Sequence, residues 1–231
     1  MKQIIKSVEP QSLVQHRANQ PAYFDNLPPK AKDDLRQSLL SEQGYICCYC
    51  MKRIPEKVKN DGIDSYDMKV EHFKCQDSFS GLQLSYSNLL GACTGNEGKP
   101  KKLQTCDTKK GNSIKLTINL IAKSPNCETL FKYNAEGEIS SINGDAAIDK
   151  QLNEILNLNM QSLKDARSEV FLEVQEKIKV ESKRFKNDKA GFVKHLEIER
   201  NNWLNRSDNK YRPYCMVAIY YLTKKVNQNQ N

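Results

Sequence analysis

Ile46-Cys47-Cys48-Tyr49-Cys50 opens the stretch that decides the fold, and Cys106-Asp107-Thr108-Lys109-Lys110-Gly111-Asn112 closes it. Cys47 and Cys50 have the C-x2-C spacing of a metal knuckle, and Cys93 with Cys106 can supply the other half of a four-thiolate site. Zinc takes four nitrogen or sulfur ligands in closed structural sites. The pattern therefore predicts a structural Zn²⁺ site that holds a loop-rich segment together.

A C-x2-C pair can also be a redox dithiol, which is the main alternative. That chemistry uses a βαβ context and a helix N-terminus that lowers the thiol pKa. The residues after Cys50 instead include Pro55 and read as a loop. The 12 residues between Cys93 and Cys106 exceed the usual knuckle spacing. It is the complete set of four cysteines, more than their spacing, that favours zinc.

Four polar residues accompany these cysteines: Glu71-His72 and Asn88 between the two pairs, and Asp107 after the last cysteine. Hydrolysis of a phosphodiester needs an activated water and a cation that neutralises developing charge. His72 suits the first task because an imidazole titrates near neutrality. Glu71 and Asp107 are hard oxygen ligands for Mg²⁺ or Mn²⁺. Neighbours in a strand point to opposite sides, so Glu71 and His72 can share a site only where the strand ends and twists.

Glu71-His72, Asn88 and the Cys106-x3-Lys110 tail resemble the HNH nucleases, the ββα-metal class of phosphodiesterases. Residues 39–47 and two tyrosine-rich stretches near the end, 211–214 and 220–222, make the resemblance more specific. Together they resemble the endonuclease subunit of Septu and retron anti-phage systems, the PtuB-like family. The resemblance is strong over residues 39–112 and weak from 113 to 205.

The resemblance implies a role for each residue of the motif. His72 would be the general base, and Glu71 with Asp107 would hold the catalytic Mg²⁺ or Mn²⁺. Asn88 would tie a loop and orient the histidine, and Lys110 would contact the scissile phosphate. The simpler interpretations are a turn asparagine and an exposed lysine. Asp107 departs from the family, which usually has His or Asn at that position.

Composition fits this interpretation without establishing it. The chain has 231 residues and a formal net charge of +8, which suits an anionic partner. Residues 1–6 lack the apolar core of a signal peptide and no apolar run approaches a bilayer span, so we expect a cytoplasmic protein with reduced thiols. Five lysines gather in the predicted module (Lys99, Lys101, Lys102, Lys109, Lys110), and four cysteines remain for packing or surface positions (Cys48, Cys75, Cys127, Cys215).

The predicted fold class is α+β, a zinc-stapled ββα-metal module with a mostly helical C-terminal region. Residues 1–112 form the first domain, with its core at 40–112, and residues 113–231 form the second. Strands are predicted at 68–72 and 89–93, with a helix from Cys106. We also expect a short strand and irregular arm over 1–27, a loop at 51–67 and an exposed loop at 94–105. The remaining expected elements are a hairpin over 129–142, helices over 30–43, 145–157, 162–187, 191–205 and 213–226, and a frayed tail over 227–231.

The expected function is metal-dependent endonucleolytic cleavage of DNA as an anti-phage effector. RNA cleavage, for example of transfer RNA, is one alternative, and a non-catalytic zinc module that binds nucleic acid or a partner is another. The resemblance implies an ABC/SMC-like ATPase partner, PtuA, and in retrons also a reverse transcriptase with its msDNA. We expect residues 145–226 to dock on the ATPase, with the tyrosines of the last helix either in that interface or in the core.

Overall fold

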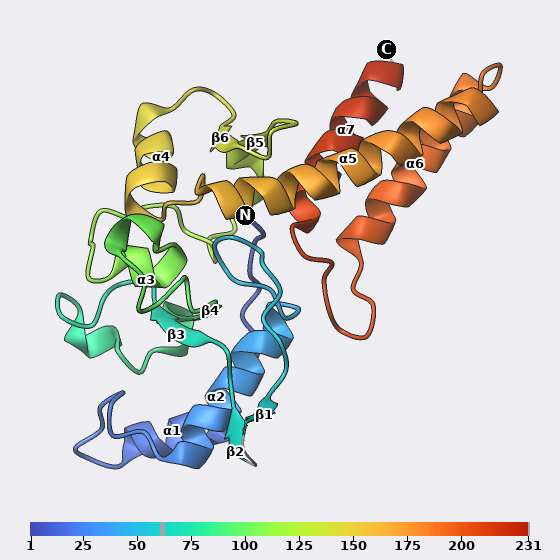
Figure 1. Cartoon of the computed structure of the whole chain (residues 1–231). Helices are drawn as coiled ribbons and strands as arrows, with labels where there is room; N and C mark the ends of the chain where they lie inside the picture. The colour runs from blue at the N-terminus through green and yellow to red at the C-terminus, as the bar shows by residue number, and fades with distance from the viewer. Residues whose placement is uncertain (61–62, 231) are drawn as a thin grey trace.

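The centre of the molecule is an antiparallel strand pair followed by a short helix. The computed structural model describes residues 1–60 and 63–230. Strands β3 (Lys69–His72) and β4 (Leu89–Ala92) pair so that His72 lies opposite Leu89, and α3 (Cys106–Lys110) follows. All three elements lie where the sequence predicted them. Figure 1 shows them between the N-terminal helices and the long helix α5.

The N-terminal arm differs from the prediction. Residues 1–9 form no strand, and α1 (Gln11–Ala18) replaces the irregular arm. Pro10 precedes this helix instead of breaking one, since a proline is tolerated at a helix start. Within residues 1–9, the Ile4 amide donates to the Leu120 carbonyl at 2.8 Å, but these residues do not pair with a strand. Helix α2 (Pro29–Glu42) matches the predicted helix and leads directly to the cysteine knuckle.

Two of the expected loops contain short structure. Strands β1 (Val58–Asn60) and β2 (Ile63–Ser65) pair within the segment predicted as a loop. Short strands of this kind give little periodic signal, which explains the miss. The turn signal Asp61-Gly62 lies outside the described residues. Turns of 3₁₀ helix also interrupt the loops at Ser80–Leu82, Tyr86–Asn88, Lys101–Leu103 and Cys127–Leu130.

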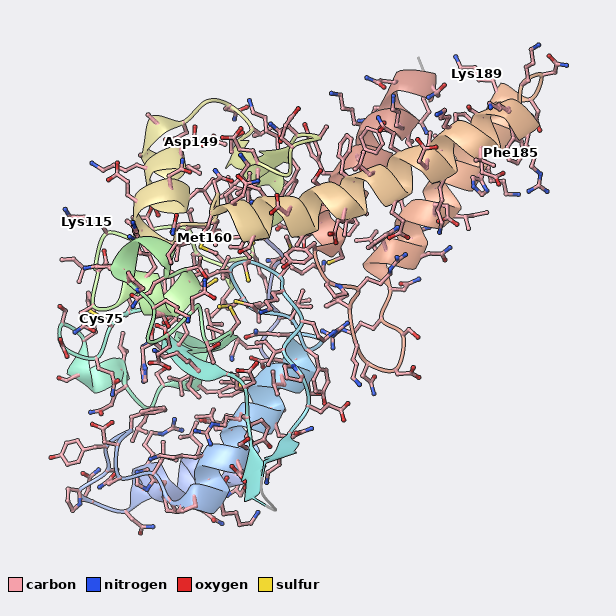
Figure 2. The ribbon with its side chains drawn as sticks, viewed as in Figure 1. Cys75, Lys115, Asp149, Met160, Phe185 and Lys189 are labelled. Atoms are coloured by element: carbon pink, nitrogen blue, oxygen red, sulfur yellow. The ribbon has the colours of Figure 1, made fainter. Side chains whose placement is uncertain are left out.

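The second half is a hairpin and a set of helices. Strands β5 (Phe131–Tyr133) and β6 (Ile139–Ser141) form the predicted hairpin, and α4 (Ala146–Lys150) continues as a π-helical turn over Gln151–Ile155. Three longer helices match the remaining predictions, and Figure 1 shows them packed side by side: α5 (Gln161–Arg184), α6 (Lys189–Leu204) and α7 (Cys215–Gln230). Figure 2 shows Phe185 and Lys189 at the end of this bundle farthest from Cys75. Helix α7 continues to Gln230, so the prediction of a frayed tail was wrong for residues 227–230.

The main core is continuous between the two halves. It includes Met1, the knuckle cysteines, Trp203 and Val226. A smaller core beneath α1 and α2 buries Leu13, Leu35 and Leu89 among other residues. The domain boundary at residue 112 stays a prediction, although buried side chains from both sides of it belong to the same core. None of the described helices has the length and apolar character needed to cross a bilayer.

The segment from Arg206 to Tyr214 packs on the cysteine knuckle. The Tyr211 amide donates to the Gly44 carbonyl at 3.0 Å, and the Tyr214 amide donates to the Met51 carbonyl at 3.1 Å. Gly44 has φ +60°, and a Cβ there would collide with the Tyr211 ring. Glycine is therefore required at the end of α2 both for its backbone and for this close approach. We refer to residues 206–214 as the clamp segment.

Candidate functional site

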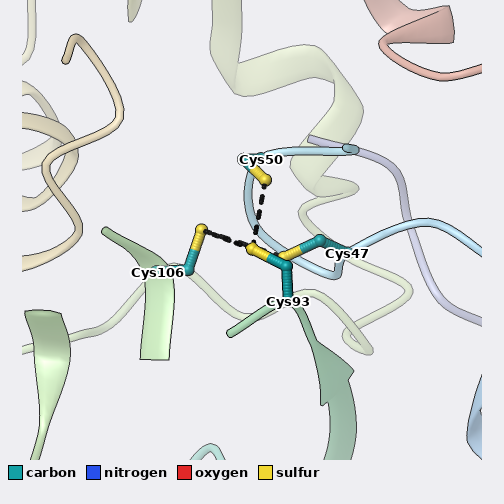
Figure 3. Close-up of side chains that lie close together, drawn as sticks. All are labelled: Cys47, Cys50, Cys93 and Cys106. Carbon is teal, nitrogen blue, oxygen red and sulfur yellow. Dashed lines mark hydrogen bonds between the residues drawn. The ribbon is translucent and has the colours of Figure 1, made fainter. Parts of the chain in front are cut away.

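The four predicted zinc ligands converge on one buried point. Figure 3 shows the side chains of Cys47, Cys50, Cys93 and Cys106 gathered at one place. Their Sγ atoms all lie within 4.8 Å of one another. Three of the separations are 3.8 Å: Cys47 to Cys106, Cys50 to Cys93, and Cys93 to Cys106. Zn–S bonds of about 2.3 Å in a tetrahedron place sulfurs roughly 3.8 Å apart. The thiol set therefore fits a zinc ion in both chemistry and spacing.

The backbone around the thiols has the turns that such a site needs. Met51, with φ 65°, donates its amide to the Cys47 carbonyl at 3.0 Å, and the Lys52 amide points at Cys50 Sγ at 3.4 Å. The long insertion between the last two cysteines folds back on itself, since the Thr105 amide donates to the Gly95 carbonyl at 2.9 Å. A Cβ on Gly95, whose φ is +56°, would collide with the Thr105 carbonyl. This closure explains how 12 residues can separate two adjacent ligands.

The other four cysteines are buried and are not part of the thiolate cluster, although Cys48 is the neighbour of Cys47. Cys48, Cys75, Cys127 and Cys215 are all free thiols in the described chain. Burial raises the pKa of Cys215 to about 11, so this thiol stays protonated and inert. This outcome agrees with the packing role expected for them.

A cavity of about 270 Å³ opens beside the thiolate cluster, between β3 and α3. Strand β3 ends at His72, and both Glu71 and His72 line the cavity although they are neighbours in the strand. Because the strand ends at His72, the side chains of Glu71 and His72 can both serve this one site. Its wall also includes Lys69, Asp107, Thr108, Lys110 and Asn112.

Glu71 is a buried carboxylate with one satisfied and one unsatisfied oxygen. Its Oε1 accepts a hydrogen bond from the Tyr49 hydroxyl at 2.6 Å and lies 2.7 Å from Lys110 Nζ. Its Oε2 is buried without a hydrogen-bond partner. Burial raises the pKa of Glu71 well above its usual range, and the nearby Asp107 carboxylate raises it further. A divalent cation would reverse both effects, because it supplies positive charge beside two carboxylates.

Asp107 joins Glu71 from the first turn of α3. Its side chain is 15% exposed, and its Oδ2 lies 3.4 Å from Lys69 Nζ. Two carboxylates are a small ligand set, which suits Mg²⁺ because this ion usually keeps several of its waters. Glu71 and Asp107 are therefore the residues that could hold a catalytic cation.

His72 is held with one ring nitrogen engaged and the other available. Its Nε2 lies 3.0 Å from the Gln83 carbonyl, which places the proton of the neutral ring on Nε2 and leaves Nδ1 as a base. The Phe24 ring packs edge-on against the imidazole, with 4.5 Å between ring centroids. Burial lowers the pKa of His72, so the neutral base persists below the usual titration range.

Asn88 joins the two ends of the loop that follows β3. Its Oδ1 accepts from the Lys74 amide at 2.8 Å, and its Nδ2 donates to the Lys74 carbonyl at 2.9 Å and the Leu82 carbonyl at 3.2 Å. These bonds fix residues 74–82 beside Gln83, whose carbonyl holds the imidazole of His72. Asn88 thus acts on the histidine through the loop and does not touch its ring.

Lys110 is not the exposed lysine that the simpler interpretation described. Its side chain is 1% exposed, and Nζ contacts both Glu71 and the His72 carbonyl, the latter at 2.8 Å. Of the other four lysines, Lys99, Lys101 and Lys102 are exposed and Lys109 is half-buried. Lys110 therefore belongs to the wall of the cavity, whereas Lys99, Lys101 and Lys102 belong to a solvated basic loop.

Sequence reasoning missed three groups around the site. Tyr49 was given no role, because it lies between two ligand positions of the knuckle. The Gln83 carbonyl and the Phe24 ring had no signal, because both depend on loops that fold over β3. The sequence thus identified the charged groups and Asn88, but not Tyr49, Phe24 and Gln83, which contact those charged groups.

Comparison with known proteins gives one relevant match. No family model matches the chain. It is 29% identical over 128 residues to a protein named Septu protein PtuB from Bacillus thuringiensis. The match covers 55% of this chain and 42% of that protein, so the chain spans less than half of the relative's length. The match confirms the resemblance noted from the motif: the chain is similar, at a distance, to a PtuB protein of the Septu system.

Proposed function

We propose that this protein is a metal-dependent HNH endonuclease that hydrolyses phosphodiester bonds in DNA and acts in an anti-phage defence system. One observation carries the proposal. A buried base and two carboxylates, His72, Glu71 and Asp107, line one cavity beside a four-thiolate cluster. The similarity to Septu protein PtuB supports the defence role.

In the proposed reaction, Nδ1 of His72 takes the proton of the attacking water. Asn88 and the Gln83 carbonyl keep the ring in the tautomer that this transfer requires. Glu71 and Asp107 would hold Mg²⁺ or Mn²⁺, and this cation would neutralise charge that develops on the phosphate and the leaving oxygen. The thiolate cluster holds β4 and α3 together and therefore fixes the distance between the base and the carboxylates.

Two other functions follow from different uses of the same module. Cleavage of RNA, including transfer RNA, would use the same groups, because the proposed site grips phosphate and not the sugar. A non-catalytic zinc module would need neither Glu71 nor His72. The orphan Glu71 Oε2 favours an enzyme over that module, since a buried unsatisfied carboxylate oxygen has a cost that a purely structural site avoids.

We also propose an ABC/SMC-like ATPase partner, PtuA, with a retron reverse transcriptase and its msDNA as further partners in that context. The tyrosines of the last helix do not form an exposed patch for such docking. Tyr214 is buried, Tyr220 packs against Tyr133, and Tyr221 packs against Phe171 at 4.4 Å between centroids. Deleting residues 206–231 would also remove the clamp segment from the knuckle, so it cannot test docking alone.

A surface substitution tests the partner without disturbing the core. Val180 on α5 is 61% exposed and lies at the far end of the helical bundle, while Ile5 is 80% exposed near the N-terminus. We expect Val180→Asp to weaken co-elution with a co-expressed ATPase and Ile5→Asp to leave it unchanged. A wild-type chain that elutes alone from the co-expression would refute the partner.

The central experiment measures cleavage of nucleic acid directly. Purified protein, alone and with the ATPase, is incubated with DNA or RNA and Mg²⁺ or Mn²⁺, and His72→Ala is the control. We expect wild type to cut DNA and His72→Ala to cut it about 10²–10⁴-fold more slowly. We expect Asp107→Ala to need a different cation or a higher cation concentration. Cutting of RNA alone would favour the ribonuclease, and equal cutting by His72→Ala would refute the proposed base.

A further inference from the structure

Tyr49 connects the thiolate cluster to the candidate cation ligand. It stands between Cys47 and Cys50 and is 1% exposed. Its hydroxyl donates to Glu71 Oε1 at 2.6 Å, which is the length of a strong hydrogen bond to a carboxylate. The two cysteines fix the backbone on either side of the tyrosine, so its ring has little freedom once the cluster has formed.

The two carboxylate oxygens of Glu71 differ in their hydrogen-bond partners. Tyr49 and Lys110 both contact Oε1, whereas Oε2 is buried and no donor reaches it. A carboxylate whose first oxygen is held in place by two donors cannot rotate freely about its terminal bond. The remaining oxygen therefore keeps a constant direction beside the cavity that Asp107 also lines.

We propose that Tyr49 is a positioning residue for the catalytic cation, holding Glu71 through Oε1 so that Oε2 is the ligand atom. This inference rests on the proposed nuclease function and adds to it a residue outside the motif. Partners that orient metal ligands commonly change metal affinity by about 10-fold to 100-fold when removed. The knuckle would thereby set the geometry of the second metal site as well as its own.

The test is a Mn²⁺ titration of the zinc-loaded full chain, read by electron paramagnetic resonance. We expect Tyr49→Phe to bind Mn²⁺ about 10-fold more weakly than wild type with unchanged zinc content. Tyr86→Phe is the matched control, because Tyr86 is also buried and donates to a buried carboxylate, Glu42 Oε2, at 2.8 Å. It should bind Mn²⁺ as wild type does, and Glu71→Gln should bind none.

A cleavage assay gives a second readout. With Tyr49→Phe, the Mg²⁺ concentration for half-maximal rate should rise about 10-fold, while the rate at saturating Mg²⁺ stays near wild type. A merely structural role would instead lower the active fraction without changing the metal dependence.

The outcomes separate the inference from the proposed function. If Tyr49→Phe binds Mn²⁺ as tightly as wild type while Glu71→Gln does not bind, the positioning role is wrong and the metal site stands. If wild type binds no Mn²⁺, or Glu71→Gln binds it equally well, the metal site fails and takes the inference with it. Should Tyr49→Phe not fold, a crystal structure of wild type with Mn²⁺ decides. Coordination through Oε2, with the Tyr49 hydroxyl still on Oε1, supports the role, and coordination through Oε1 overturns it.

Discussion

Two buried clusters in this molecule each contain a glutamate, a lysine and a tyrosine. They differ in whether the second carboxylate oxygen of the glutamate has a hydrogen-bond donor. At the end of α2, Glu42 contacts Lys6 through Oε1, and its Oε2 accepts from the Tyr86 hydroxyl at 2.8 Å and from Ser7 at 3.1 Å. Beside α3, Glu71 contacts Tyr49 and Lys110 through Oε1 alone. We refer to these as the Glu42 triad and the Glu71 triad.

The difference separates a structural group from a candidate functional one. Both carboxylates have side chains that are 1% exposed, so burial does not distinguish them. Glu42 has donors on both oxygens, so neither oxygen is left without a partner. Among the residues that the structure describes, Glu71 Oε2 is the buried carboxylate oxygen that lacks a partner. An unsatisfied atom of this kind is a better marker of function than burial or charge.

Loss of zinc should have the largest effect, because the Glu71 triad depends on the knuckle and the Glu42 triad lies outside it. A zinc site of this kind supplies about 10–16 kcal/mol of folding free energy in small zinc modules. We expect about one zinc per chain, and we expect Cys47→Ser or Cys106→Ser to lose both zinc and solubility. Metal analysis of the soluble fraction checks this. Full solubility and an unchanged melting curve after chelation would refute a structural zinc.

Removal of the proposed base should have the next largest effect. General-base catalysis contributes about 10²–10⁴-fold, so His72→Ala should lose cleavage by that factor and keep its zinc and fold. His16→Ala is a matched control, since its Nε2 also lies 3.0 Å from a carbonyl, that of Tyr23, at an exposed position. Initial rates on labelled DNA give the comparison, and a slow His16→Ala would point to a general loss of folded protein.

The two triads should respond differently to a divalent cation. A ligand at 100 times its Kd stabilises the folded state by about 2.7 kcal/mol, so Mn²⁺ should raise the melting temperature of wild type. Glu71→Gln should abolish this increase, whereas Glu42→Gln should lower the starting melting temperature and keep the increase. Thermal melts with and without Mn²⁺ measure both. Equal increases in the two variants would remove the distinction between the triads.

The smallest predicted effect is on the pH profile of cleavage. Burial lowers the pKa of His72 from its usual 6.5, so the neutral base is retained as the pH falls to that value. At saturating cation, the rate should therefore fall to half at a pH below 6.5. A midpoint above pH 7 would mean that the limiting group is not this histidine.

Features that depend on neighbouring residues could be predicted from the sequence, whereas features that depend on contacts between distant segments could not. The strand pair, helix α3 and the long helices follow from local periodicity, and the four cysteines follow from residue type. Helix α1 was missed because Pro10 reads equally well as a breaker and as a start. Tyr49, Phe24 and Gln83 were missed as site residues because their roles depend on contacts between segments far apart in the chain. Asn88 and Lys110 were identified by resemblance, but the partners of their side chains were visible only in the structure.

The clamp segment has a consequence for the order of biosynthesis. Arg53, which follows the knuckle, donates to the Tyr211 carbonyl across a separation of 158 residues. Ribosomes add about 5–20 residues per second, so roughly 8–30 s pass between synthesis of the knuckle and of the segment that completes it. During that interval a nascent chain exposes the knuckle without its cover. The module is therefore completed only after residues 206–214 have been translated.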